Sequence, residues 1–418
     1  MRMSESRLKV LILAMKYLPA SGGSTTYAYN LAKGLSESGI QVTLMAPHYG
    51  KRAVNAKKEP FTVRRMRGTS VSLGGLRILV AAFHVWRIVL QHRPDVIWAT
   101  SFASGCVLAL LKFLRIPLIG TIHGGAIHRR YPARSVGARF WDLLGMQFMR
   151  RADALVAVSA YSRKLMVQKI PDPSIDAKLQ VIYNGISWKP ETFVGRSEAR
   201  RRLGIAETTR VILCVGRLIR AKGQDVLIRS IGLLQHAFND VLVVIVGEGS
   251  QIHFLKQLAM ECGVSPLVKI EGYVNDVALE NWYGACDVLV HPGRHTPDFV
   301  EMFGLVLVEA GLRGKPVIAS RLGGIPEAVV ENKTGILVAP EDERQLANAL
   351  VRLLENADQR ACIAEAAKRH TESHFTSVAM AKNNLVLLQR LVTKKEGVHS
   401  RRSHFRQTGS VAKPDTFL

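Results

Sequence analysis

The stretch Val211-Ile212-Leu213-Cys214-Val215-Gly216-Arg217 decides the fold class. Its apolar, partly β-branched run ends at a glycine, which predicts a β-strand followed by a loop. Residues 225–234 then have the spacing of a helix, and a second apolar run follows at 241–246. A strand, a helix and a strand in this order are typical of a βαβ unit in a parallel sheet.

The same alternation extends over most of the chain. Further strands are expected at the apolar runs 9–15, 41–46, 96–99, 118–121, 154–158, 181–183, 288–290, 316–319 and 335–338. Further helices are expected at 27–38, 104–114, 162–168, 252–260 and 305–313. The pattern restarts after a polar stretch at 187–197, which predicts an α/β protein of two Rossmann-like domains.

The expected domains are residues 1–190 and 191–376. A closing helix at 377–391 is expected to complete the first domain, whereas the basic residues 393–418 lack an apolar period and are expected to be disordered. A chain of 418 residues is long for one core, which also favours two domains.

Cysteine usage and hydropathy indicate a cytoplasmic protein. The five cysteines are odd in number and far apart, so neither a disulfide framework nor a zinc site is suggested. The apolar run at 10–15 is too short for a secretory signal, and the longest one, at 102–111, is too short to span a bilayer.

The net charge of +24 is unevenly distributed along the chain. Residues 1–190 hold 28 Lys and Arg against 8 Asp and Glu, whereas residues 191–392 hold 23 of each. A basic half joined to a neutral half indicates that the first domain faces something anionic, either nucleic acid or an acidic membrane surface. Nucleic acid is disfavoured because no zinc-finger, RNA-binding strand or basic-zipper pattern accompanies the charge.

Two glutamates separated by seven residues form the strongest candidate site. Glu301 precedes an expected helix, and Glu309 is expected about two turns into it. Between them, Gly304 and Leu305 present backbone N–H groups at the helix N-terminus, where a phosphate fits. The two carboxylates can then accept hydrogen bonds from a sugar on one side and a ribose on the other.

Two cations follow the strand at 211–215. Arg217 and Lys222 can neutralise a diphosphate leaving group, Arg through a bidentate fork and Lys as a point charge. Ligands of open α/β sheets bind at the carboxyl ends of the strands, which is where these residues stand.

The order of these motifs resembles the family 4 (group 1) glycosyltransferases of GT-B fold, over roughly residues 8–392. The motifs that carry the resemblance are Gly216-Arg217…Lys222-Gly223, Val246–Gly249, Glu271–Val274, His291-Pro292, Glu301…Glu309-Ala310, Gly314–Ser320 and Gly323–Glu327. The resemblance implies parallel sheets facing a central cleft, a retaining mechanism without a metal or cofactor, and a nucleotide-sugar donor in the second domain. It places the acceptor largely in the first domain, in agreement with the charge asymmetry.

The resemblance also implies roles for individual residues. Glu301 corresponds to the residue that binds the donor sugar and Glu309 to the one that binds the ribose, with Arg217 and Lys222 as the diphosphate clamp. His123 corresponds to the active-site histidine that faces the transferred sugar. The other donor-binding positions are Gly22, Gly23, Glu248, Tyr273, Val274, Phe303, Gly304 and Leu305.

Two departures from the family pattern, Met302 and Gly293, leave the identity of the sugar open. The chain has no Asp-x-Asp pair, which argues against a metal-bound diphosphate.

Basic and aromatic residues are interleaved in the first domain, as in an interfacial amphipathic helix. A membrane or acceptor patch is expected at Arg129, Arg130, Arg134, Arg139, Trp141, Phe148, Arg150 and Arg151. The apolar stretch 76–90 is instead interpreted as a core helix with a solvated basic edge, because its apolar residues would lie on nearly all sides of the helix.

The sequence thus predicts a hexosyl- or N-acetylhexosaminyltransferase that uses a UDP- or GDP-sugar. Its expected acceptor is a lipid-linked or otherwise anionic glycan of the cell envelope, at the inner face of the cytoplasmic membrane. A nucleotide-sugar epimerase of the same two-domain fold is the alternative, although it would need no basic acceptor domain.

Overall fold

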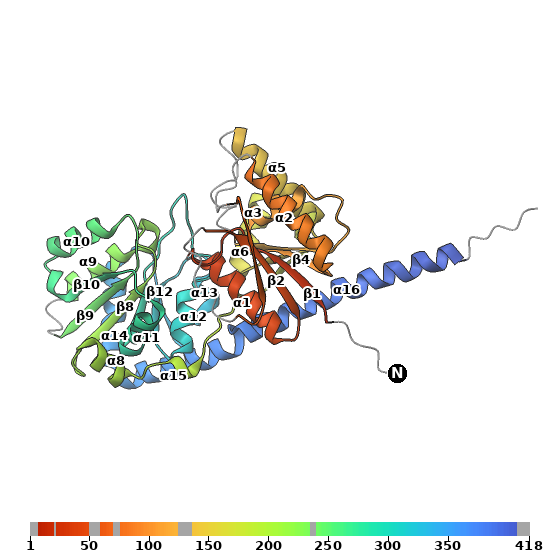
Figure 1. Ribbon diagram of the computed structural model, residues 1–418. Helices are drawn as coiled ribbons and strands as arrows, with labels where there is room; N and C mark the ends of the chain where they lie inside the picture. The colour runs from red at the N-terminus through yellow and green to blue at the C-terminus, as the bar shows by residue number, and fades with distance from the viewer. Residues whose placement is uncertain are drawn as a thin grey trace, which may run out of the picture.

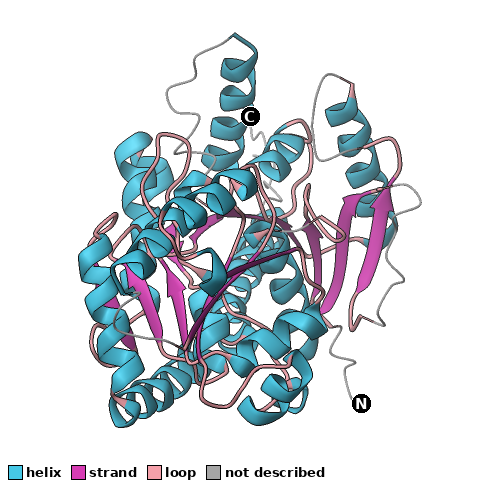
Figure 2. Ribbon diagram, turned by 90° about the vertical axis from the view of Figure 1, so that its left-hand side faces the viewer, coloured by secondary structure: helices cyan, strands magenta, loops and turns pink. Residues whose placement is uncertain are grey.

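The protein contains two parallel β-sheets, each flanked by helices on both sides (Figures 1 and 2). The structure is a computed structural model and describes residues 7–20, 22–49, 59–69, 76–123, 136–234 and 240–407. The first sheet has the strand order β3-β2-β1-β4-β5-β6-β7 and the second the order β10-β9-β8-β11-β12-β13. The predicted α/β class with two Rossmann-like domains is therefore confirmed.

The strands of the first sheet are β1 (Lys9–Leu13), β2 (Gln41–Pro47), β3 (Thr62–Met66), β4 (Val96–Ala99), β5 (Leu118–Ile122), β6 (Ala154–Ala157) and β7 (Leu179–Val181). Its helices are α1 (Gly23–Glu37), α2 (Arg77–His92), α3 (Phe102–Ala109), α5 (Val136–Arg151), α6 (Ala160–Lys169) and α7 (Pro173–Asp176). Apolar residues of α2, α3 and α5 pack on one face of the sheet, and those of α1 and the C-terminal helix pack on the other.

The strands of the second sheet are β8 (Arg210–Val215), β9 (Val241–Val246), β10 (Val268–Gly272), β11 (Val288–His291), β12 (Val317–Ser320) and β13 (Gly335–Val338). Its helices are α8 (Arg196–Leu203), α9 (Gln224–Leu234), α10 (Ile252–Glu261), α11 (Asp276–Ala285), α12 (Leu305–Leu312), α13 (Ile325–Ala328), α14 (Glu343–Glu355) and α15 (Ala357–His374), with short 3₁₀ turns η2 (Pro190–Thr192), η3 (Arg220–Lys222) and η4 (Ser265–Leu267). Helices α9, α10 and α14 cover one face, and α11, α12 and α13 cover the other.

The chain crosses between the two halves twice, and the crossings are hydrogen-bonded to each other. The backbone N–H of Ile186 donates to the carbonyl of Phe375 (2.8 Å), and that of Ser377 donates to the carbonyl of Ile186 (2.9 Å). A Cβ at Gly185 would lie 2.1 Å from the Thr376 carbonyl oxygen, so this close approach requires glycine. The two crossings therefore form a single connection between the halves.

After the second crossing, α16 (Ser377–Gln407) packs against α1 of the first half (Figure 1). The sequence predicts this helix to end at 391, whereas the described helix continues to Gln407. The disorder expected of the tail stays a prediction. Residues 408–418 lie outside the described part of the chain. The missing apolar period rules out a packed face, but it does not prevent a helix in a proline-free segment rich in Lys and Arg.

Candidate functional site

Lys222 and Glu301 form an ion pair at the carboxyl ends of two neighbouring strands. The Lys222 Nζ lies 2.5 Å from Glu301 Oε2, and His291 Nε2 lies 3.2 Å from the same oxygen. Lys222 follows β8, whereas His291 ends β11 and Glu301 comes after it; β8 and β11 are adjacent and parallel. The sheet therefore brings together two predicted residues and His291, to which the sequence assigned no role.

The electrostatics of this cluster keep Glu301 ionised and His291 neutral. Burial raises the pKa of the Glu301 carboxyl, but the Lys222 ammonium and the His291 hydrogen bond outweigh burial and hold this pKa well below its usual range. Burial and the nearby Lys222 charge lower the pKa of His291. A neutral imidazole that donates from Nε2 fixes the carboxylate, and Glu301 Oε1 is then oriented to accept a hydrogen bond from a substrate hydroxyl.

Arg217 and Lys222 both lie near the ring of Phe299. The Arg217 guanidinium carbon is 5.6 Å and the Lys222 Nζ 5.2 Å from the centroid of the Phe299 ring. Both cations therefore lie beside the same aromatic ring, and both follow β8 at the carboxyl edge of the sheet, where an anion can bind.

The N-terminus of α12 faces the glycine loop of the first half, formed by Gly22 and Gly23, which are two of the predicted donor-binding positions. Gly304 precedes α12 with a φ of 85°, and a Cβ at Gly23 would lie 3.9 Å from Leu305 Cδ1. The expected phosphate-binding N–H groups therefore lie opposite the predicted glycine loop, on the other half of the molecule.

Glu309 lies just over one turn into α12, not two, because the helix begins at Leu305. Its Oε2 accepts a hydrogen bond from the Tyr283 hydroxyl of α11 (2.7 Å). Burial raises the pKa of Glu309, against the opposing effects of Tyr283 and Arg313. Tyr283 was not predicted, and it orients the carboxylate that the resemblance assigns to the ribose.

Lys16 is a further cation that the sequence analysis missed. It follows β1, and a Cβ at Gly22 would lie 3.2 Å from its Nζ. Burial and the Arg217 charge on the other half lower the pKa of Lys16. Its position directly after the first strand was the available signal, since that is the carboxyl edge of the sheet.

His123 directly follows β5 and is held in one tautomer. Its Nε2 lies 3.0 Å from the Thr100 carbonyl oxygen and therefore donates to it, which leaves Nδ1 as an acceptor. The ring stands edge-on to Tyr27, with centroids 4.9 Å apart. Burial lowers the pKa of His123 to about 4, so the imidazole is neutral at pH 7.

The remaining donor positions differ in their surroundings. Glu248 and Tyr273 are exposed and follow β9 and β10, at the same edge as Arg217, and Val274 is half-buried beside them. Phe303 is only 2% exposed, and its ring packs against Tyr183 and Phe375. The Phe303 side chain is therefore part of the core, so the predicted contact of Phe303 with the donor could be made only by its backbone.

The expected membrane or acceptor patch is largely dispersed. Arg129, Arg130 and Arg134 lie outside the described residues. Phe148 is buried at 3%, because it fills the space above two glycines, Gly105 and Gly120. The predicted insertion of Phe148 into a membrane is therefore wrong.

The other members of the patch have mixed roles. Arg151 donates to the carbonyls of Leu108, Leu111 and Leu114 and so binds the end of α3, whereas Arg150 pairs with Asp172 (2.8 Å). Trp141 is half-buried against the core, and Arg139 is exposed.

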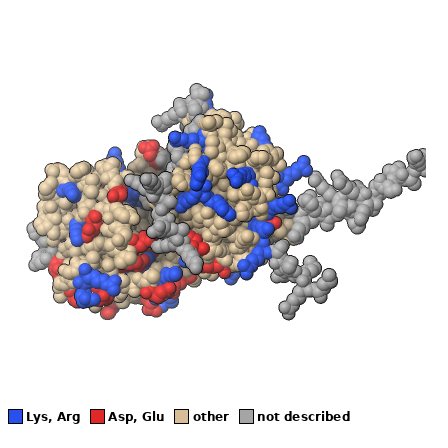
Figure 3. Space-filling model, viewed as in Figure 1, with Lys and Arg blue, Asp and Glu red and all other residues tan. Residues whose placement is uncertain are grey.

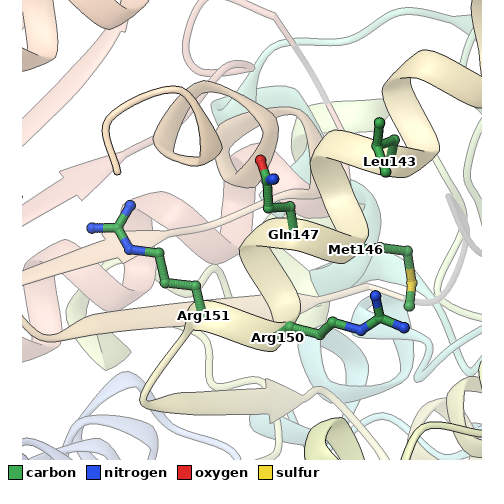
Figure 4. Close-up of a pocket in the computed structure, with 5 residues that line it drawn as sticks. All are labelled: Leu143, Met146, Gln147, Arg150 and Arg151. Atoms are coloured by element: carbon green, nitrogen blue, oxygen red, sulfur yellow. The ribbon is translucent and has the colours of Figure 1, made fainter. Parts of the chain in front are cut away.

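An open hollow of about 340 Å³ lies on the outer side of α5 (Figure 4). It is lined by Leu143, Met146, Gln147, Arg150 and Arg151.

No described helix is long and apolar enough to cross a membrane. Within the same ranges, no group of three or more His, Cys, Asp or Glu side chains is arranged to hold a metal ion.

Comparison with known proteins places this site in a family. Residues 21–187 match the family model described as Glycosyltransferase Family 4, and residues 195–370 match that described as Glycosyl transferases group 1. The chain belongs to this family of glycosyltransferases and has its GT-B fold.

Individual relatives are similar over most of their length. A D-inositol 3-phosphate glycosyltransferase of Corynebacterium urealyticum is 30% identical, over 90% of this chain and 92% of the relative. A GDP-mannose-dependent α-(1-6)-phosphatidylinositol monomannoside mannosyltransferase of Mycobacterium tuberculosis is 28% identical, over 86% and 92%. The structure of Anabaena HepE in complex with UDP-glucose superposes with a TM-score of 0.72 at 25% identity, over 92% of this chain and all of that one. The protein is therefore an enzyme that transfers a glycosyl group.

Proposed function

We propose that the protein is a retaining hexosyl- or N-acetylhexosaminyltransferase that uses a UDP- or GDP-sugar and needs no metal. The observation that carries this proposal is the pair of cations, Arg217 and Lys222, beside the ionised Glu301. The cations neutralise the diphosphate as it leaves, so a divalent ion is not required for that purpose. Glu301 Oε1 and His123 Nδ1 accept hydrogen bonds from the sugar hydroxyls and fix the orientation of the ring.

The donor is held mainly by the second half. The N-terminus of α12 binds a phosphate through its N–H groups, and Glu309 binds the ribose hydroxyls through its carboxylate. Both UDP and GDP are candidate donor nucleotides, because one similar structure contains UDP-glucose and one relative is named for GDP-mannose.

The acceptor is a lipid-linked or otherwise anionic glycan. The first half carries the whole excess of positive charge outside the tail, and Lys and Arg are prominent on its surface (Figure 3). Relatives named for inositol phosphate and phosphatidylinositol acceptors support an anionic acceptor. The enzyme is cytoplasmic and works at the inner face of the membrane. The epimerase alternative gains no support, since the relatives described above are named as transferases.

A screen of UDP- and GDP-sugars for hydrolysis without an acceptor tests the donor assignment. One nucleotide-sugar should be hydrolysed faster than the others, and calorimetry should show that it binds. Failure of every UDP- and GDP-sugar to bind or react would refute the donor assignment.

A further inference from the structure

The outward side of α2 carries a stripe of large apolar side chains. Exposed fractions are 54% for Leu79, 55% for Phe83 and 58% for Leu90. The complete stripe, called here the α2 stripe, consists of Leu76, Leu79, Phe83, Trp86 and Leu90. At 100° per residue these five positions fall within an arc of about 80° on the helix.

The α2 stripe is separate from the core side of the same helix. Ile78, Ala81, Ala82, Val85 and Val89 are the buried residues of α2 and pack on the first sheet. The interpretation of 76–90 as a core helix is therefore correct for one side only. The apolar residues on nearly all sides of the helix therefore divide into a buried face and this exposed stripe, and an exposed group of large apolar side chains is typical of an interaction surface.

The charged residues of the α2 segment itself are all basic. Residues 76–93 contain no Asp or Glu, and Arg77, Arg87 and Arg93 are exposed. Basic residues beside an apolar stripe with a tryptophan are typical of a helix that lies in a membrane interface.

Neighbouring elements of the same layer also carry exposed apolar side chains. Helices α2, α3 and α5 form one layer on the first sheet, and α3 contacts both of the others (Figure 1). In that layer Phe113, which follows α3, and Phe140 and Leu143 of α5 are 52–63% exposed. Lys112 and Arg115 beside Phe113, and Arg139 beside Phe140, are exposed cations.

Charge decides between the two occupants that could cover the stripe. A second copy of the chain would bring the basic residues of one α2 against those of the other, and like charges at such spacing repel. An acidic lipid surface offers negative headgroups to the cations and acyl chains to the apolar side chains at the same time.

We propose that the α2 stripe inserts into the headgroup region of an acidic bilayer, with Arg77, Arg87 and Arg93 at the phosphates. The inference rests on the proposed lipid-linked acceptor and moves the membrane contact from the predicted patch around α5 to α2. Helix α2 then docks the first half on the surface that holds such an acceptor.

Sedimentation of the full-length protein with phospholipid vesicles tests this inference. The vesicles contain either phosphatidylcholine alone or phosphatidylcholine with phosphatidylglycerol. Wild type should sediment with the acidic vesicles, and salt should reduce but not abolish binding, because insertion of apolar groups is not screened. The double variant Leu79→Ser, Phe83→Ser should bind at least about tenfold more weakly.

Matched variants separate insertion from charge and from folding. Arg87→Glu should weaken binding to acidic vesicles at low salt and have little effect at high salt. Phe254→Ser, which replaces an exposed apolar residue of α10 in the second half, should bind like wild type. The melting temperatures of all variants should stay close to that of wild type, since each site is exposed.

The inference would be overturned if the stripe variant bound vesicles as well as wild type does, or if wild type bound neither kind of vesicle. It would also be overturned if sedimentation velocity showed that wild type is a dimer and that the stripe substitutions dissociate it. Hydrolysis of the nucleotide-sugar in solution measures the function of the donor site independently of vesicle binding. Loss of vesicle binding with hydrolysis intact supports docking through α2, whereas a protein that binds vesicles but uses no nucleotide-sugar refutes only the proposed function.

Discussion

The carboxylate of Glu327 accepts a hydrogen bond of 2.8 Å from the backbone N–H of Tyr161, across the boundary between the two halves. It also accepts one of 2.6 Å from Ala160. These are the first two residues of α6, whose N–H groups have no partner within the helix. A side chain of the second half thus caps a helix of the first half and holds the halves in this arrangement.

Glu327→Ala should weaken this contact between the halves by about 2 kcal/mol, the value typical of hydrogen bonds to a charged acceptor. We expect a lower melting temperature and a larger radius of gyration in small-angle X-ray scattering, because the halves separate more readily. Glu365→Ala, which removes an exposed carboxylate that pairs with Arg369 on the same helix, is the control. An unchanged scattering curve for Glu327→Ala would show that the contact does not hold the halves together.

Lys222→Met should reduce donor hydrolysis at least about 100-fold, because a charged contact to the leaving group is lost where water is largely excluded. Arg220→Met is the matched control, since Arg220 is an exposed cation of the same turn. Activity is measured on variants whose circular dichroism matches wild type. A rate within threefold of wild type for Lys222→Met would remove Lys222 from the donor site.

The structure also predicts a pH dependence of stability. The pKa of His123 is about 4 in the fold, against 6.5 as its ordinary value, so below pH 6.5 the unfolded chain binds a proton that the folded chain does not. The stabilising effect of the neutral ring is therefore present above pH 6.5 and is lost progressively toward pH 4. At pH 5 the loss is about 2 kcal/mol.

His123→Gln should flatten this dependence, because glutamine does not titrate. Urea unfolding at pH 7 and pH 5, followed by tryptophan fluorescence, measures the change. His253→Gln, at an exposed position of α10, is the control and should retain the wild-type difference. A His123→Gln protein that still loses as much stability as wild type would mean that another group causes the loss.

The sequence predicts the central strands and the edge strand β13 well, but it does not predict two other edge strands. The strand 96–99 is predicted with the bounds that β4 has, because all four residues are buried. Strands β3 and β10 were missed. Each lies at the edge of its sheet, and the exposed Arg64 or Lys269 interrupts the apolar run by which a strand is recognised.

The candidate site is predictable where its residues lie at strand ends, and not where a role depends on packing. Arg217, Lys222 and Glu301 could be found because their motifs follow strands. Phe148 could not be assigned, since its burial depends on glycines from two distant elements. The α2 stripe was missed for a similar reason, because a helix that is apolar nearly all round does not reveal which side faces the sheet.

Transfer should retain the anomeric configuration of the donor and should continue in the presence of EDTA. We expect the charge of the diphosphate to be neutralised by Arg217, Lys222 and the N–H groups of α12 instead of by a metal ion. Proton NMR of the fresh product distinguishes the two anomers before they equilibrate. An inverted product would contradict the proposed mechanism, and loss of activity that Mg²⁺ or Mn²⁺ restores would contradict the role of the cations.

Lys16 provides the last prediction, because it is the cation by which the first half can contact the donor. Its Nζ lies beside Gly22, and the Arg217 charge of the second half helps to lower its pKa. Two such cations repel each other until an anion lies between them, so a bound diphosphate should relieve the repulsion and draw the halves together. Binding of the donor should therefore depend on Lys16.

Lys16→Met should raise the KM for the nucleotide-sugar about tenfold and lower kcat less than Lys222→Met does, because we expect Lys16 to bind the phosphate in the ground state as well as in the transition state. Lys9→Met, at an exposed position at the start of β1, is the matched control. Free UDP or GDP should show the same loss of affinity in calorimetry. A tenfold fall in kcat with unchanged KM would instead place Lys16 at the leaving group, and wild-type values for both would exclude it from the site.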